Sequence, residues 1–189
     1  NLPRVLDPVM TGSLEALTQQ MSFDHKVRLD TRAPDVSPLL ASIPEGPERN
    51  FLADDIRDLT QQLGALLGRK HVEARFYVQR TDGCRKIHTD YVSVRLLCTY
   101  VGLGTEWIPN AGLVRAHLGR TDVDVATANR SMVREGARLK RSEPGEVLLL
   151  KGDSFPGNKG NGIAHRSPPL GPSELARLIL KIDEHECGC

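Results

Sequence analysis

The clearest indication of the fold is a stretch in which polar and apolar residues alternate, Val72-Glu73-Ala74-Arg75-Phe76-Tyr77-Val78-Gln79. Its apolar side chains fall at every second position, which is the period of a β-strand. One face of such a strand packs in a core, and the other faces solvent or borders a cavity. The stretch therefore predicts that the chain builds a sheet after residue 70.

Further strands are expected because turn residues, such as Thr81-Asp82-Gly83 and Pro144-Gly145, separate short apolar segments. We predict these strands at residues 91–101, 113–118, 146–151 and 176–182. Residues 119–143 are rich in charge and carry no clear pattern. Short strands that are joined by turns, with no helix between them, favour an antiparallel sandwich or barrel.

The first third of the chain has helical periodicity instead. Leu14, Leu17 and Met21 share one face of a short amphipathic segment, for which Ser13 is a suitable N-cap. Leucine and isoleucine recur at three- and four-residue spacing over residues 48–67, which predicts a longer helix.

These patterns predict one domain of the α+β, mainly β class. Residues 1–70 are expected to form a helical layer that packs on a β-barrel of residues 71–189. The length of 189 residues suits one well-buried domain, and 39% hydrophobic and 26% charged residues are typical of a soluble globular protein.

Charge and hydropathy narrow the classes of function. The net charge of +1 gives no electrostatic reason to expect nucleic acid as a partner. No apolar run is long enough to cross a bilayer. Residues 1–10 lack the pattern of a signal peptide, so cytoplasm is the expected location.

A candidate metal site comes from His88, Asp90 and His165. The first two stand two residues apart where a turn passes into a strand, and His165 lies near the far end of the predicted sheet. Two histidines and a carboxylate form the facial triad of non-haem Fe(II) oxygenases, which leaves positions open for a co-substrate and oxygen. Zinc could use the same ligands and a water for hydrolysis, with Glu106 as the candidate general base. Alternatively, both histidines are polar residues satisfied by nearby backbone.

Arg177 is the candidate ligand for a co-substrate carboxylate. It follows His165 by twelve residues and starts the last predicted strand. A guanidinium there could pair bidentately with a carboxylate if its face lines a cavity, and otherwise it is a solvated strand charge. Tyr100 could hydrogen-bond the same carboxylate. Candidates for substrate contact, each with a structural or surface role as the alternative, are Arg75, Tyr77 and Arg95.

The last residues offer a possible second metal site. His185, Cys187 and Cys189 supply an imidazole and two thiols at alternate positions, which suits zinc or Cu(I). A fourth ligand could come from Cys84, a water or another chain. The alternative is a frayed tail with reactive thiols.

Several blocks of sequence also carry a resemblance to known proteins: His88-Thr89-Asp90, Arg95-Leu96-Leu97-Cys98-Thr99-Tyr100, Gly104-Thr105-Glu106-Trp107, Lys151-Gly152 and His165-Arg166-Ser167-Pro168. Over roughly residues 70–183, the chain resembles an uncharacterised bacterial family known as a domain of unknown function.

More distantly, the order His-x-Asp, His and then a basic residue is similar to that of the 2-oxoglutarate-dependent Fe(II) dioxygenases. This resemblance implies a double-stranded β-helix, which is a jelly-roll, cupin-like barrel. It also implies that His88, Asp90 and His165 bind iron and that Arg177 holds the distal carboxylate of 2-oxoglutarate. Many such enzymes carry Ser two residues after the basic residue, where this chain has Ile179.

Three functions follow as hypotheses. The first is an Fe(II)- and 2-oxoglutarate-dependent oxygenase that hydroxylates an unidentified small molecule or protein. The second is a non-catalytic zinc-binding or metal-homeostasis protein that uses the barrel, the tail or both. The third is a zinc hydrolase.

Overall fold

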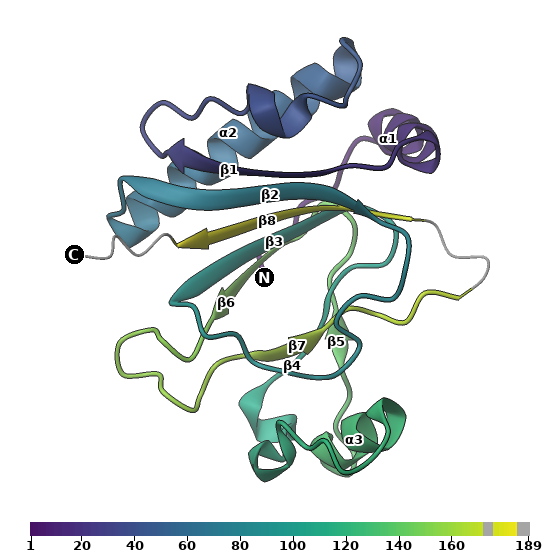
Figure 1. Cartoon of the computed structure of the whole chain (residues 1–189), viewed down its shortest axis with the longest axis vertical. Coiled ribbons are helices and arrows are strands. Elements are labelled where there is room, and N and C mark those ends of the chain that lie inside the picture. Colours follow the sequence, from purple (N-terminus) through teal and green to yellow (C-terminus); the bar gives the residue numbers. More distant parts are fainter. Residues whose placement is uncertain (172–175, 185–189) are drawn as a thin grey trace.

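The computed structural model describes residues 1–171 and 176–184. The chain is α+β, and its strands form two antiparallel sheets (Figure 1). The larger sheet has the order β1 (Asp24–Asp30), β2 (His71–Gln79), β8 (Arg177–Glu184), β3 (Val94–Val101) and β6 (Val147–Lys151). The smaller sheet has the order β5 (Lys140–Arg141), β4 (Glu106–Ile108) and β7 (Ala164–Arg166).

The helices lie on either side of this pair of sheets (Figure 1). The helices α1 (Pro8–Gln20) and α2 (Pro47–Leu67) lie beside the larger sheet, and α3 (Val125–Met132) lies beyond the smaller one. Short 3₁₀ turns complete the secondary structure: η1 (Ser37–Leu40), η2 (Asn110–Gly112) and η3 (Arg115–His117). None of the helices in the described residues is long and apolar enough to cross a membrane.

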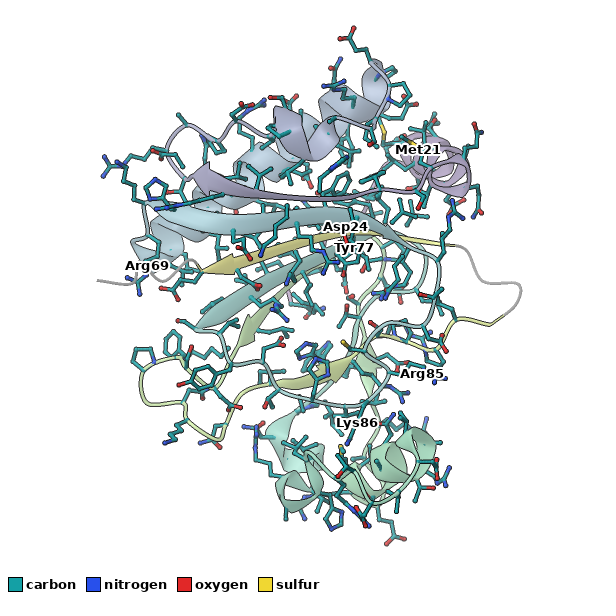
Figure 2. All side chains as sticks on the ribbon, viewed as in Figure 1. Met21, Asp24, Arg69, Tyr77, Arg85 and Lys86 are labelled. Atoms are coloured by element: carbon teal, nitrogen blue, oxygen red, sulfur yellow. The ribbon has the colours of Figure 1, made fainter. Side chains whose placement is uncertain are left out.

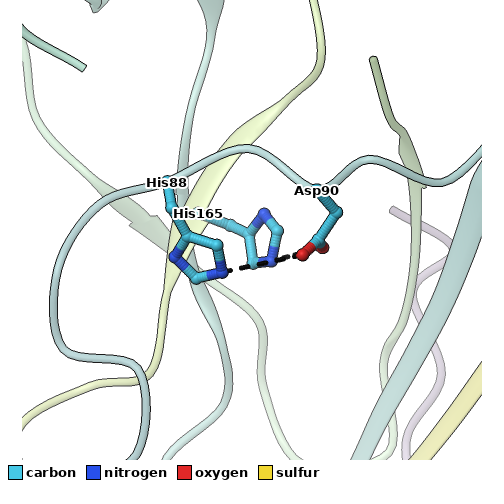
Figure 3. Close-up of side chains that lie close together, drawn as sticks. All are labelled: His88, Asp90 and His165. Carbon is cyan, nitrogen blue, oxygen red and sulfur yellow. Dashed lines mark ion pairs between the residues drawn. The ribbon is translucent and has the colours of Figure 1, made fainter. Parts of the chain in front are cut away.

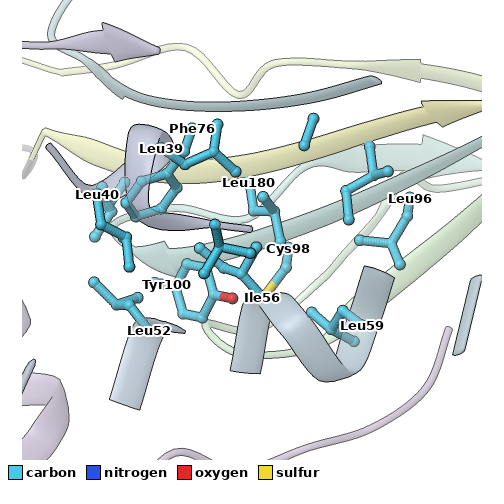
Figure 4. Close-up of a cluster of buried hydrophobic side chains, with 14 of the residues drawn as sticks. Leu39, Leu40, Leu52, Ile56, Leu59, Phe76, Leu96, Cys98, Tyr100 and Leu180 are labelled. Carbon is cyan, nitrogen blue, oxygen red and sulfur yellow. The ribbon is translucent and has the colours of Figure 1, made fainter. Parts of the chain in front are cut away.

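The main core fills the space between the helices and one face of the larger sheet. The leucine and isoleucine residues of α2 that recur along the sequence are buried there, as the periodicity of residues 48–67 predicted. They pack on alternate residues of the central strands, among them Phe76, Cys98 and Leu180 (Figure 4). The central strands β2, β3 and β8 therefore present their even-numbered residues to the helices.

The opposite face of the larger sheet, which we call the inner face, turns toward the smaller sheet. Leu97, Leu148, Leu150 and Ile179 are buried on it and pack with residues of the smaller sheet and of the segment before β7. The strands β3 and β8 consequently alternate between two buried environments rather than between core and solvent. The inner face also carries polar residues at the odd positions of β2, β3 and β8.

Several predictions of secondary structure were wrong. The expected strand at 113–118 instead contains η3 and the residues that flank it, and α3 occupies part of the unpatterned segment 119–143. The first third contributes the strand β1 as well as helices. The helix α1 begins at Pro8 with Asp7 as its N-cap, because the Asp7 carboxylate accepts from two backbone N–H groups of the first turn. Ser13 lies inside the helix.

The expected barrel is not closed in the described part of the chain. There, β1 and β6 are the edges of the larger sheet, and the two sheets share no strand. Two facing sheets nevertheless bring segments far apart in sequence together on the inner face.

Candidate metal centre

His88 and His165 lie opposite each other in an antiparallel bridge. The backbone N–H of His88 donates to the carbonyl of His165 at 3.0 Å, and the N–H of His165 donates to the carbonyl of His88 at 2.9 Å. His165 is the central residue of β7, whereas His88 belongs to the segment that leads into β3. Direct pairing places the two side chains on the same side, with ring centroids 4.6 Å apart.

The backbone also fixes which nitrogen each histidine offers. Nδ1 of His88 lies 2.8 Å from the carbonyl oxygen of Lys86, and Nδ1 of His165 lies 3.1 Å from that of Ile163. A carbonyl can only accept, so Nδ1 carries the proton in both rings. The Nε2 atoms are left to face Asp90, at 3.7 Å for His88 and 3.0 Å for His165 (Figure 3).

Asp90 is held as a carboxylate. Burial alone would raise the pKa of Asp90, but the contact with His165 and the nearby charge of Arg95 outweigh it and lower the pKa to about 2. Arg95 donates to its Oδ2 at 2.5 Å and is itself held by two hydrogen bonds to Asp183, at 2.6 and 2.9 Å. Burial and the neighbouring His165 lower the pKa of His88, which favours the neutral imidazole that a metal requires.

The donor set fits a divalent metal ion. The ligand atoms of His88, Asp90 and His165 all lie within 4.8 Å of one another. Both imidazoles offer Nε2 while Nδ1 is fixed by a second group, an arrangement typical of metal-binding histidines. Two nitrogens and one carboxylate oxygen leave coordination positions open, which suits Fe(II) as well as catalytic zinc.

Arg177 is buried on the inner face, only 1% exposed, so it is not a solvated strand charge. Its guanidinium donates to the carbonyl of Leu103 at 2.6 Å, to Oε1 of Gln79 at 2.8 Å, and to the hydroxyls of Thr99 and Thr105 at 3.3 Å each. All these acceptors are neutral, and no carboxylate of the described residues contacts the guanidinium. Burial lowers the pKa of Arg177 to about 10, and the opposing effect of Glu106, which does not contact the guanidinium, is smaller.

The strand β4 and Thr105, the residue before it, link Arg177 to the histidines. Thr105 contacts the Arg177 guanidinium directly. Trp107, two residues later, pairs with His165 across β4 and β7. The buried guanidinium and the histidine pair therefore border the same space between the sheets.

The structure does not bring Tyr100 to this site. Tyr100 lies on the helix-facing side of β3, opposite to Thr99, and donates its hydroxyl proton to Oδ2 of Asp55 at 2.6 Å. Arg4 binds the same carboxylate. We therefore correct its expected contact with a co-substrate carboxylate: Tyr100 belongs to the core under α2 (Figure 4).

Of the candidates for substrate contact, Tyr77 is on the inner face. It packs in the apolar cluster of Leu97, Leu148, Leu150 and Ile179, and burial raises its pKa. Arg75 is half-exposed, pairs with Asp24 at 2.5 Å and covers the Tyr77 ring. Asp24 and Tyr77 are themselves opposite each other across β1 and β2 (Figure 2). Arg95 touches Asp90 itself and holds that metal-binding candidate.

Glu106 is not placed to act as a base at the metal. Its carboxylate accepts from Arg141 and Arg166 at 2.6 and 2.7 Å. It also precedes Trp107 on β4, so it points to the opposite face of that strand from the partner of His165. Cys84 is an exposed free thiol. The candidate second site, His185, Cys187 and Cys189, lies outside the described residues.

Other residues that shape the site had not been identified from the sequence. Asp183, Thr99 and Gln79 become relevant only through the pairing of β8 with β2 and β3, and Thr105 only through its contact with Arg177. Asp153 and Asn129 hold the ligand-bearing segments by hydrogen bonds across long sequence separations. Strand alternation could have indicated two of them, because Thr99 and Gln79 occupy odd-numbered positions like Arg95 and Tyr77 and so lie on the same face of the sheet.

Solved structures similar to this chain include a hydroxylase and a dioxygenase. A Pseudomonas putida prolyl-4-hydroxylase has 14% identity and a TM-score of 0.43, over 97% of this chain and 89% of that one. The Fe(II)/α-ketoglutarate-dependent dioxygenase TqaL has 13% identity and a TM-score of 0.47, over 94% and 74%. A full-length Neurospora crassa protein in complex with α-KG has 14% identity and a TM-score of 0.43, over 98% and 62%. Such values by themselves assign neither fold nor reaction.

No curated protein sequence matches the chain. A family model does, and it spans nearly the whole length. The model covers residues 3–183 and is described as a protein of unknown function, DUF1826. As the sequence blocks around His88 and His165 predicted, the chain belongs to a family of unknown function, DUF1826.

Proposed function

We propose that this protein is a metal-dependent oxygenase of the Fe(II)/2-oxoglutarate type, with a double-stranded β-helix core formed by the two facing sheets. The observation that carries the proposal is the combination of His88, Asp90 and His165 with the buried, uncompensated guanidinium of Arg177. A buried charge without a counter-charge is unfavourable, so such a group is expected to receive an anion.

Each residue has a distinct part in this proposal. His88, Asp90 and His165 would hold the metal, which supplies the redox chemistry for oxygen activation when Fe(II) is bound. Arg177 would bind the distal carboxylate of 2-oxoglutarate. The hydroxyls of Thr99 and Thr105, at 3.3 Å from the guanidinium, are available to that carboxylate where other enzymes use a serine. Tyr77 and the apolar residues around it exclude water from the inner face.

The test is binding of metal and co-substrate to the metal-free protein under anoxic conditions. Calorimetry with 2-oxoglutarate, with and without Fe(II), is expected to show binding that depends on the metal. Arg177→Met should weaken the co-substrate affinity by about 10- to 100-fold, since one charge-assisted hydrogen-bond pair is lost. Arg75→Met is the matched control, because Arg75 is already paired with Asp24 and should leave this affinity unchanged.

Elemental analysis distinguishes the alternatives. Iron bound at one equivalent and lost in the His88→Ala, Asp90→Ala double variant supports the oxygenase, and oxygen-dependent conversion of 2-oxoglutarate to succinate would follow. Zinc at the same ligands, with no binding of 2-oxoglutarate, would instead support the metal-homeostasis hypothesis. A zinc hydrolase is disfavoured because Glu106 is held by Arg141 and Arg166.

A further inference from the structure

Asp153 contacts both segments that carry the candidate metal ligands. It lies in the loop between β6 and β7, and its Oδ2 accepts a hydrogen bond from the hydroxyl of Thr89 at 2.6 Å. Its Oδ1 accepts from the backbone N–H of Gly162 at 2.8 Å. Its own backbone N–H donates to the carbonyl of Asp90 at 2.9 Å.

These contacts fall at positions that control the ligands. Thr89 stands between His88 and Asp90, so its side chain fixes the course of the short segment that carries them. Gly162 precedes Ile163, whose carbonyl accepts from Nδ1 of His165. A single carboxylate thus ties the His88–Asp90 segment to the start of the His165 segment.

The glycines beside Asp153 indicate how closely the two segments approach. A Cβ at Gly152 would lie 2.0 Å from the carbonyl oxygen of Val92 and 2.8 Å from that of Asp90. A Cβ at Gly162 would lie 2.9 Å from Oδ1 of Asp153 itself. Gly152 therefore requires the absence of a side chain, because the loop presses its backbone against the segment after Asp90. A side chain at Gly162 would instead displace the Asp153 carboxylate.

We propose that Asp153 is a positioning residue for the metal site, which holds His88, Asp90 and His165 in register by binding Thr89 and Gly162 at once. The inference rests on the proposed metal site but not on the proposed reaction. It predicts that the loss of Asp153 separates the two ligand-bearing segments and lowers metal affinity even in a folded protein.

The experiment is a Co(II) titration of the metal-free protein, with the visible absorption spectrum of the bound ion as a second measurement. Asp153→Ala is expected to weaken Co(II) binding by about 10- to 100-fold, as for other residues that orient metal ligands, and to change the Co(II) spectrum. Asp153→Asn keeps one acceptor oxygen and should recover part of the affinity.

The matched control is Asp7→Ala. Asp7 also binds backbone N–H groups, those of Val9 and Met10 at the start of α1. Its loss is expected to lower the melting temperature of the metal-free protein while the Co(II) affinity and spectrum stay unchanged. If Asp153→Ala behaves in the same way, Asp153 is only a loop-stabilising residue and the proposal is overturned.

Thr89→Val provides a second variant in case Asp153→Ala does not fold. It removes one of the contacts of Asp153 and should give a smaller loss of Co(II) affinity in the same direction, whereas wild-type affinity would contradict the proposal. If the His88→Ala, Asp90→Ala variant binds Co(II) like the wild type, the metal site itself is wrong and Asp153 positions nothing. If Co(II) binds but 2-oxoglutarate does not bind to the Co(II)-loaded protein, only the proposed oxygenase function is contradicted.

Discussion

Each candidate histidine ligand is oriented by its own local backbone. In both cases Nδ1 faces the carbonyl of the residue two positions earlier, Lys86 for His88 and Ile163 for His165. This contact requires an extended backbone before the histidine, and the antiparallel bridge between the two histidines keeps the backbone extended. The Nε2 atoms are consequently directed at Asp90 before any metal arrives, so little reorganisation is required on binding.

Tyr100 illustrates a residue whose role can be tested in isolation. Tyr100→Phe removes the hydrogen bond to Asp55, which keeps its contacts with Arg4. We expect the free energy of unfolding to fall by about 1–2 kcal/mol, because a buried carboxylate loses one of its donors. Metal and 2-oxoglutarate affinities should not change. Urea denaturation measures the free energy of unfolding, and calorimetry measures the affinities. A loss of co-substrate affinity would mean that Tyr100 contributes to the site.

The grouping of His88, Asp90 and His165 could be predicted from the sequence, whereas the expected position of Tyr100 was wrong. His88 and Asp90 are neighbours in sequence, and the Arg177 face was read from its spacing with Ile179 and Lys181. Tyr100 and Arg95 belong to one predicted strand but differ by an odd number of positions. Strand alternation therefore already placed them on opposite faces.

At the level of elements, the errors have physical causes. The strand β1 has only two apolar residues in alternation, Val27 and Leu29. It lies at the edge of the sheet, where most of its other side chains are exposed and polar, so its sequence carries only a weak strand pattern. Between residues 109 and 120, Leu113 is buried by packing with α3 and Ile108 rather than by strand pairing on both sides. The apolar residues of this segment therefore serve tertiary packing in a small cluster, although their spacing in the sequence resembles that of a strand.

The helix α3 holds the segment that leads to His88. Asn129 of α3 accepts from the N–H of Ile87 at 2.8 Å and donates to the carbonyl of Arg85 at 2.9 Å. Asn129→Ala should lower the free energy of unfolding by about 1–3 kcal/mol, because the buried N–H of Ile87 and the partly buried carbonyl of Arg85 lose their partners. Amide exchange at Ile87 should accelerate. Ser131→Ala is the control, since the Ser131 hydroxyl bonds only within α3 to the Ala128 carbonyl. Equal exchange in both variants would contradict a role of α3 in fixing this segment.

The smaller sheet depends on pH through Glu106. Burial alone would raise the pKa of Glu106, but Arg141 and Arg166 outweigh it and hold the pKa below 4.5. A lowered carboxyl pKa stabilises the fold above pH 4.5, and this contribution is lost as the pH falls through the folded-state value.

Glu106→Gln should therefore be less stable than the wild type by about 1–2 kcal/mol at pH 7. The difference should shrink as the pH falls below 4.5. Thermal unfolding between pH 3 and pH 7 measures it, and Glu135→Gln, an exposed site, is the control. A difference that is independent of pH would mean that Glu106 stabilises the sheet by packing and not by its charge.

At the scale of the whole molecule, the candidate site joins the two sheets. His165 belongs to the smaller sheet, and His88 is bonded to it. Asp90 is tied through Arg95 to Asp183, and so to β3 and β8 of the larger sheet. The sequence could not predict this arrangement, because it depends on which strands face each other and not on the pattern within any one strand. A metal bound to these residues would therefore link two sheets that share no strand in the described ranges.

Metal binding should consequently stabilise the molecule as a whole. At a free metal concentration 100 times Kd, the free energy of unfolding is expected to rise by about 2.7 kcal/mol. For a chain of this length the melting temperature should rise by roughly 5–10 °C. Hydrogen exchange should slow in residues 88–90 and 164–166, which lie on the two sides of the site.

The His88→Ala, Asp90→Ala double variant should show neither change when Fe(II) or Co(II) is added, and a chelator should reverse both changes in the wild type. The exchange pattern distinguishes this site from any other metal-binding group. If the melting temperature of the double variant rises as much as that of the wild type, the metal binds elsewhere and does not link the sheets. If the wild type is stabilised but exchange slows at His88 and His165 and not at Asp90, then Asp90 stays bound to Arg95. The metal would in that case be held by the two histidines alone.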